Sequence, residues 1–153
     1  MANEAYRAVF LRVHPTGKMV LSLTTDSDGK EPDYAALVGR ELGVPALDVK
    51  VVAADTDRFG EGHGYNTSPS AGAPAAISGA TAKIRDKAQL LAGMALEADP
   101  DTLKWSGGAW VKGDDDDPTQ LKTIEDVALY AHGTGELPPG VEGGLDAQTV
   151  YAD

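Results

Sequence analysis

The side chains best suited to acid–base chemistry in this sequence are histidines and carboxylates in polar, glycine-rich surroundings. Imidazole changes its charge between about pH 5 and 8, and carboxylates in such loops can be aimed at a substrate by the backbone. Asp28 and Asp33 also have a structural explanation, since carboxylates ahead of a helix are stabilised by the helix dipole. The six candidates for catalysis are Asp28, Asp33, His63, His132, Glu142 and Asp146.

A second group of candidates lies where a polar, glycine-rich loop at residues 60–72 runs into a helix whose first turns are almost all Ala and Gly. Glycines let the backbone approach a ligand closely, and a helix start presents unsatisfied N–H groups and the positive end of a dipole. A polar or anionic ligand would be held well there. The alternative is that the loop only connects a strand to a helix. The candidate ligand-binding residues are Gly64, Tyr65, Asn66, Ser70, Gly72 and Ala73.

The spacing of the remaining residues supports no metal site and no nucleotide site. The acidic run at residues 114–117 and Glu125 match part of an EF-hand loop, but Pro118 and Thr119 break the pattern. The three histidines lack His-x-x-x-His or His-x-His spacing. The chain has no cysteine, no Walker loop and no Gly-x-Gly-x-x-Gly motif. Thiol, iron–sulfur and nucleotide-cofactor chemistry are therefore not expected.

Length and charge limit the class of protein further. A chain of 153 residues with 42% hydrophobic residues predicts a single domain spanning residues 1–153. The chain has 24 Asp and Glu against 13 Lys and Arg, which gives a net charge of -11. We therefore expect neither nucleic acid nor a membrane as partner. The sequence has no signal-peptide pattern and no apolar run of about 20 residues. Together with the lack of cysteine, this favours a cytoplasmic protein.

The first third of the chain predicts a hairpin, a helix and a strand. Strands at 6–13 and 18–24 are separated by a turn that contains Pro15 and Gly17. A helix at 32–42 is expected to begin at Pro32 and to end at Gly43, which suits a C-terminal cap. A β-branched strand follows at 48–53.

The rest of the chain predicts one long helix, a hairpin, a short helix and a final strand. Residues 103–111 read as a hairpin with a Gly-Gly turn that brings two tryptophans together, 123–132 as a helix capped by Thr123, and 145–151 as a strand. We therefore expect an α+β fold in which one long and two shorter helices pack on a mainly mixed sheet. The apolar stripe of the long helix comprises Ile77, Ala80, Ile84, Ala88, Leu91 and Ala95.

Taken together, three segments resemble one stretch of a known family. Residues 38–56, 83–113 and 137–146, the last reading Leu-Pro-Pro-Gly-Val-Glu-Gly-Gly-Leu-Asp, are similar in order and spacing to the large, molybdenum-binding subunit of the xanthine dehydrogenase and aerobic carbon monoxide dehydrogenase family. Residues 66–72 look like the family segment that runs past the molybdopterin cofactor. The resemblance implies a molybdopterin-binding domain fragment, with Gly72 and Ala73 closest to the cofactor.

The chain departs from this family at its signature motif. The family sequence Gly-Gln-Gly-x-x-Thr falls on Ser-Asp-Gly-Lys-Glu-Pro at residues 27–32, so only Gly29 is kept. Asp28 places a carboxylate where the family has a neutral amide donor, and it would repel the oxo group and the anionic pterin phosphate. The catalytic glutamate that the resemblance implies lies further along the family sequence than this chain extends.

Three functions remain open. In the first, the domain is a metal-free enzyme or binder without a cofactor, a homo-oligomer that acts on a small, flat, heteroaromatic molecule in the former pterin cleft, similar to a phenazine demethylase-like oxidoreductase. In the second, it is an accessory piece of a split molybdenum hydroxylase, and partner subunits share the molybdopterin and supply the catalytic glutamate and further pterin contacts. The third is a non-catalytic binding module.

Overall fold

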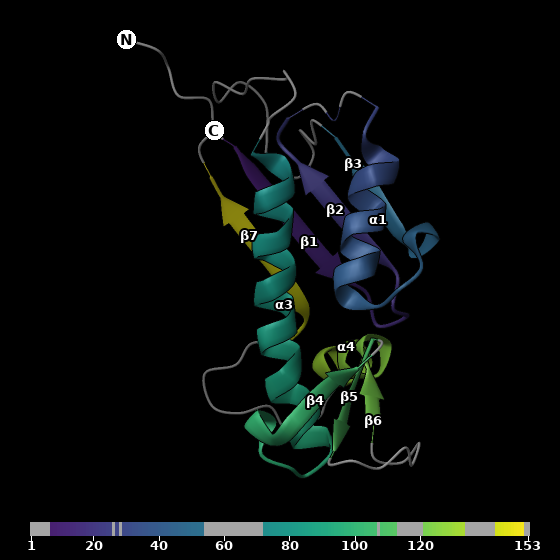
Figure 1. Ribbon diagram of the computed structural model, residues 1–153, viewed down its shortest axis with the longest axis vertical. Helices are drawn as coiled ribbons and strands as arrows, with labels where there is room; N and C mark the ends of the chain where they lie inside the picture. The colour runs from purple at the N-terminus through teal and green to yellow at the C-terminus, as the bar shows by residue number, and fades with distance from the viewer. Residues whose placement is uncertain are drawn as a thin grey trace.

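The protein is described by a computed structural model in which two β-sheets are joined by one long helix (Figure 1). The structure describes residues 7–25, 27, 29–53, 72–106, 108–112, 121–133 and 143–151. Its elements follow the predicted order closely, with one additional strand before the last helix.

The larger sheet has four strands in the order β3-β2-β1-β7. Strands β1 and β2 form the predicted antiparallel hairpin, in which the His14 N–H donates to the carbonyl of Lys18 across the turn. Strand β3 runs parallel to β2, so a crossover must connect them, while β7 runs antiparallel to β1. The predicted mixed sheet is thereby confirmed. The four strands are β1 (Ala8–Val13), β2 (Met19–Leu23), β3 (Val49–Val52) and β7 (Leu145–Val150).

Two helices cover one face of this sheet. Helix α1 (Glu31–Leu42) makes the crossover between β2 and β3 and ends at Gly43, whose left-handed backbone forms the predicted C-cap. Helix α3 (Ala73–Ala95) crosses the same face beside it, and a short 3₁₀ turn, η1 (Ala46–Asp48), leads into β3. The predicted stripe of α3 is fully buried except for Ala95, which is partly exposed.

The second sheet has three strands in the order β4-β5-β6. Strands β4 (Leu103–Ser106) and β5 (Ala109–Lys112) form the predicted hairpin, with Trp105 opposite Trp110 and their ring centroids 4.4 Å apart. Strand β6 (Leu121–Thr123) was not predicted, and it pairs with β5 as the third strand of a sheet that is separate from the first. It leads into α4 (Ile124–His132), and a short 3₁₀ turn, η2 (Pro100–Thr102), precedes β4.

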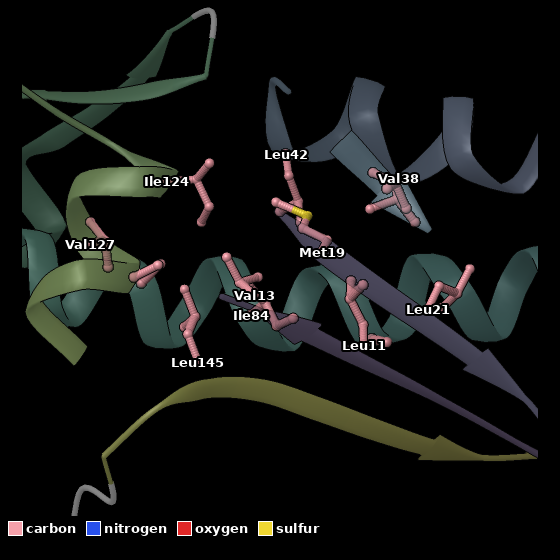
Figure 2. Close-up of a cluster of buried hydrophobic side chains, with 14 of the residues drawn as sticks. Leu11, Val13, Met19, Leu21, Val38, Leu42, Ile84, Ile124, Val127 and Leu145 are labelled. Atoms are coloured by element: carbon pink, nitrogen blue, oxygen red, sulfur yellow. The ribbon is translucent and has the colours of Figure 1, made fainter. Parts of the chain in front are cut away.

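A single hydrophobic cluster connects the two sheets. Figure 2 shows Leu11 and Val13 of β1 beside Ile84 of α3, with Ile124 of α4 and Leu42 of α1 around the same centre. All five side chains are almost completely buried. These side chains bury their apolar surface from water, which stabilises the placement of the two sheets relative to each other.

A polar contact inside this packing fixes α1 against α3. The carboxylate of Glu41 accepts hydrogen bonds from the hydroxyls of Ser78 and Thr81. Thr81 is fully buried, so without this partner its hydroxyl would rely on the Ser78 carbonyl alone. The contact therefore specifies how the two helices lie on the sheet.

Candidate functional site

The structure describes only some of the predicted site residues. Asp33, Gly72, Ala73, His132 and Asp146 lie within the described part of the chain. The other predictions fall outside the described residues: Asp28, His63, Gly64, Tyr65, Asn66, Ser70 and Glu142.

One end of the four-stranded sheet brings several candidates together. We call it the helix-start end, because β2 and β3 end there and α1 and α3 begin there (top of Figure 1). Gly72 is the N-cap of α3 and Ala73 its first residue, and Gly72 has no side chain to cap the helix. The first N–H groups of α3 therefore include donors that a ligand can satisfy. Asp33 lies in the first turn of α1, where the helix dipole explains a carboxylate.

The same end contains the turn that links β2 to α1. The Lys30 N–H donates to the carbonyl of Ser27 over 2.9 Å, which closes the turn around Gly29. Gly29 has a φ of 76°, and apart from its two chain neighbours no described residue has an atom within 4 Å of the position that a β-carbon would take. The backbone here is therefore open to close approach by another group.

Four hydroxyl groups that have no hydrogen-bond partner among the described residues lie near this end. They belong to Thr25, Ser27, Thr149 and Tyr151, and each oxygen is buried. Thr25 and Ser27 follow the end of β2 and are 1% and 0% exposed. We call these four residues the hydroxyl cluster.

The strand register explains why Thr149 and Tyr151 join the cluster. Thr149 pairs with Val9 on the buried face, and its hydroxyl lies 3.5 Å from the position of a β-carbon on Gly79 in α3. Tyr151 continues the same alternation and its N–H donates to the carbonyl of Arg7. Both side chains therefore lie on the face that α3 covers.

A buried hydroxyl without a hydrogen-bond partner lowers the stability of the fold, so four of them at one end of the sheet indicate a binding site. Leaving such a group unpaired costs about 1–3 kcal/mol, and native proteins normally satisfy it with protein, water or ligand. An occupant rich in hydrogen-bond acceptors would remove that cost. No sequence pattern predicts this cluster, because isolated Ser, Thr and Tyr residues in or after strands are common. Only the alternation within 145–151 could have placed Thr149 and Tyr151 on the buried face.

His132 and Asp146 lie at the opposite end of the sheet. The Nε2 atom of His132 is 3.0 Å from the carbonyl oxygen of Val13, to which it can donate. A β-carbon on Gly144 would lie 3.6 Å from Cε1 of His132 and 3.9 Å from Oδ2 of Asp146, so the two side chains are neighbours. The register also places Asp146 opposite Arg12 on β1.

These contacts offer structural reasons for both residues. His132 ties the end of α4 to the end of β1, and Asp146 stands in a cross-strand pair of opposite charges. The length of β1, roughly 17 Å, separates this pair of residues from Gly72 and Ala73. A catalytic site that uses both ends would need a second chain, as in the homo-oligomer expected for the metal-free enzyme. Acid–base catalysis by these residues stays a prediction.

Two negative findings apply to the described residues. They contain no group of three or more His, Asp or Glu side chains arranged to hold a metal ion. No helix among them has both the length and the apolar character needed to cross a bilayer.

Comparison with known sequences shows what the chain is similar to. The family model of the molybdopterin cofactor-binding domain matches residues 1–153. The carbon monoxide dehydrogenase large chain of Afipia carboxidovorans is 35% identical over 147 residues, which cover 92% of this chain and 17% of that protein. Subunit gamma of the 6-hydroxypseudooxynicotine dehydrogenase complex of Paenarthrobacter nicotinovorans is 30% identical over 125 residues, or 80% of this chain and 15% of that one.

Solved structures give the same picture. The crystal structure of a Cu,Mo-CO dehydrogenase in its carbon monoxide reduced state superposes with a TM-score of 0.79 and 32% identity, over 96% of this chain and 18% of that chain. Quinoline 2-oxidoreductase from Pseudomonas putida 86 superposes with a TM-score of 0.75 and 27% identity, over 96% and 19%. The chain thus spans about a sixth of the length of the curated relatives it matches.

Proposed function

Because the chain belongs to the molybdopterin cofactor-binding domain family of molybdenum hydroxylase large subunits, we propose that it forms one wall of a molybdopterin site. The remaining cofactor contacts and the catalytic glutamate come from polypeptide beyond these 153 residues, supplied by partner subunits. This is the second of the three functions that the sequence left open. It is supported by relatives of which this chain covers only 17%.

The described residues fit such a cofactor. Molybdopterin carries an anionic phosphate and many hydrogen-bond acceptors, and the hydroxyl cluster offers donors that no described residue uses. The first turn of α3, which begins at Ala73, adds backbone N–H groups at the same end of the sheet. Bound there, the cofactor would supply the oxidation–reduction chemistry of molybdenum, while the chain would hold and orient it.

The observation that carries this proposal is the position of the hydroxyl cluster. The resemblance assigned Gly72 and Ala73 to the cofactor without reference to Thr25, Ser27, Thr149 or Tyr151. The buried, unpaired hydroxyls nevertheless lie at the end of the sheet where α3 begins.

The metal-free enzyme is kept as a second candidate because one sequence observation favours it. Only Gly29 of the family signature remains, and Asp28 introduces a negative charge at the motif. In this case a flat heteroaromatic molecule would occupy the wall in place of the pterin, in a homo-oligomer. The substrate, the homo-oligomer and the cytoplasmic location all stay predictions.

The proposal is tested by measuring the molybdenum and pterin content of the protein purified together with its bound partners. We expect both to be present in a complex with larger subunits, measured by elemental mass spectrometry and by the fluorescence of the oxidised pterin. A homo-oligomer free of molybdenum and pterin that converts a heteroaromatic compound would instead establish the second candidate.

Variants of the hydroxyl cluster test whether these hydroxyls hold the pterin. Thr25→Val combined with Ser27→Ala should lower the pterin-to-protein ratio, because each lost hydrogen bond to an anionic group weakens binding by about tenfold or more. The same variant should not lower the unfolding free energy of the cofactor-free protein and should raise it, since these hydroxyls have no partner to lose and their burial is costly. Thr102→Val in η2, at the other end of the molecule, is the control for a lost hydroxyl. Full pterin content in the double variant would contradict the proposal.

A further inference from the structure

An apolar recess of about 300 Å³ lies between α1 and the outer edge of β3. We call it the β3 groove. Almost all of its lining is aliphatic, and Glu31 is the one charged residue in it. The apolar residues that matter here are Pro32, Ala35, Leu47, Val49 and Val51.

Leu47 makes this recess unusual. Its side chain is 97% exposed, the highest exposure among the large hydrophobic residues that the structure describes. A single exposed leucine is ordinary, but this one lines an apolar recess, so the two form one contiguous apolar patch.

The adjoining strand is also open. Strand β3 is the last strand of its sheet, and no strand of the described chain pairs with its outer side. The Val49 N–H already donates to the carbonyl of Ala46, so a further strand would pair with the outward backbone groups of β3 beyond it. Lys50 is the only charged residue of the strand.

The place of the groove in the fold connects it to the candidate site. Glu31 and Pro32 line the groove and begin α1, directly after the turn from Ser27 to Lys30. A segment bound in the groove would therefore lie next to the turn that contains Ser27, a member of the hydroxyl cluster. From there it could contact a ligand bound at that cluster.

We propose that the β3 groove binds an extended, aliphatic segment of the polypeptide that supplies the rest of the molybdopterin site, adding a strand to β3. The proposal rests on the proposed function. Relatives contain about six times the length of this chain, so most of their polypeptide lies outside the part that this chain matches and is a source of such a segment. An apolar recess beside an open strand accepts backbone hydrogen bonds and alternate aliphatic side chains. A second copy is less suitable, because each copy carries a net charge of -11.

The lack of cysteine in the chain permits a direct test. Leu47→Cys introduces a unique thiol in the groove, and Leu129→Cys introduces a matched thiol on α4, where Leu129 is 62% exposed. Each variant is isolated as the native complex and treated with a maleimide, and the labelling rate is compared with that of the same complex unfolded in urea. We expect Cys at 129 to react near its unfolded rate. Labelling at 47 should be slower by about tenfold or more, because the segment must first leave the groove.

A charge substitution provides the second measurement. Leu47→Lys should weaken association with the partner by about 10- to 100-fold, the value of burying one leucine, while Leu129→Lys should leave it unchanged. A complex with molybdenum and pterin in which position 47 labels at its unfolded rate overturns this inference and leaves the proposed function intact. Protection at 47 in a homodimer assigns the groove to a second copy and overturns it too. A chain that purifies alone, without molybdenum or pterin, overturns both.

Discussion

The contact between Gly108 and Gly43 is where the turn of the second sheet rests on the end of α1, and Gly108→Ala tests it. Gly108 has a φ of 93°, in the left-handed region. A β-carbon there would lie 2.7 Å from the carbonyl oxygen of Gly43 and 3.0 Å from its Cα. Both obstacles are backbone atoms, so no flexible side chain can move aside.

The expected loss of stability has two parts. The left-handed conformation costs a residue with a β-carbon about 1–2 kcal/mol. Forcing apart the two backbone segments costs about 1–3 kcal/mol more, as overpacking does elsewhere. Gly29→Ala separates these parts, because Gly29 has a φ of 76° but, beyond its chain neighbours, no described atom within 4 Å of the β-carbon position. It should lose only the first amount.

The assay is urea unfolding followed by far-ultraviolet circular dichroism, together with thermal unfolding. For a chain of this size we expect the midpoint of thermal unfolding to fall by roughly 10 °C for Gly108→Ala and roughly 4 °C for Gly29→Ala. Equal losses in the two variants would refute the reasoning, because the backbone contact at Gly43 would then contribute nothing.

Two further substitutions follow from polar contacts. Glu41→Ala should destabilise the protein by about 1.5–3 kcal/mol in urea unfolding, because the hydroxyls of Ser78 and Thr81 lose their charged acceptor, whereas Glu41→Gln keeps an acceptor and should lose less. Equal losses would contradict this expectation, because the neutral amide oxygen would then not replace the carboxylate as acceptor. Thr123→Ala should lower the unfolding free energy by about 1 kcal/mol in the same measurement, because the Thr123 side chain accepts from the Asp126 N–H in a capping box at the start of α4. An unchanged unfolding midpoint would show that the cap does not stabilise α4.

Much of the fold could be predicted because its signals are local. The stripe from Ile77 to Leu91 in α3 repeats every three or four residues, and each of its members in that span is buried. Gly43 ends α1 and Thr123 caps α4, as their residue types predict. These features depend on neighbours along the chain, so periodicity and capping rules are sufficient.

The division into two sheets could not be predicted for the opposite reason. Strand β6 has only the three residues Leu121–Thr123 and pairs with β5, so nothing in its own sequence separates it from a loop. The same limit applies to the candidate site. Strand directions place Gly72 and His132 at opposite ends of one sheet, and residue type alone gives no information on which end a residue occupies. The hydroxyl cluster depends on register between strands that are far apart in the sequence.

The paired tryptophans have an optical consequence. Trp105 and Trp110 are the only two tryptophans in the chain, and both belong to the three-stranded sheet. The guanidinium of Arg85, from α3, lies 5.2 Å from the centre of the Trp105 ring, so the indole emission also senses the docking of that sheet on the long helix. Intrinsic fluorescence excited at the red edge therefore reports on one half of the fold and is blind to the four-stranded half, where the candidate site lies.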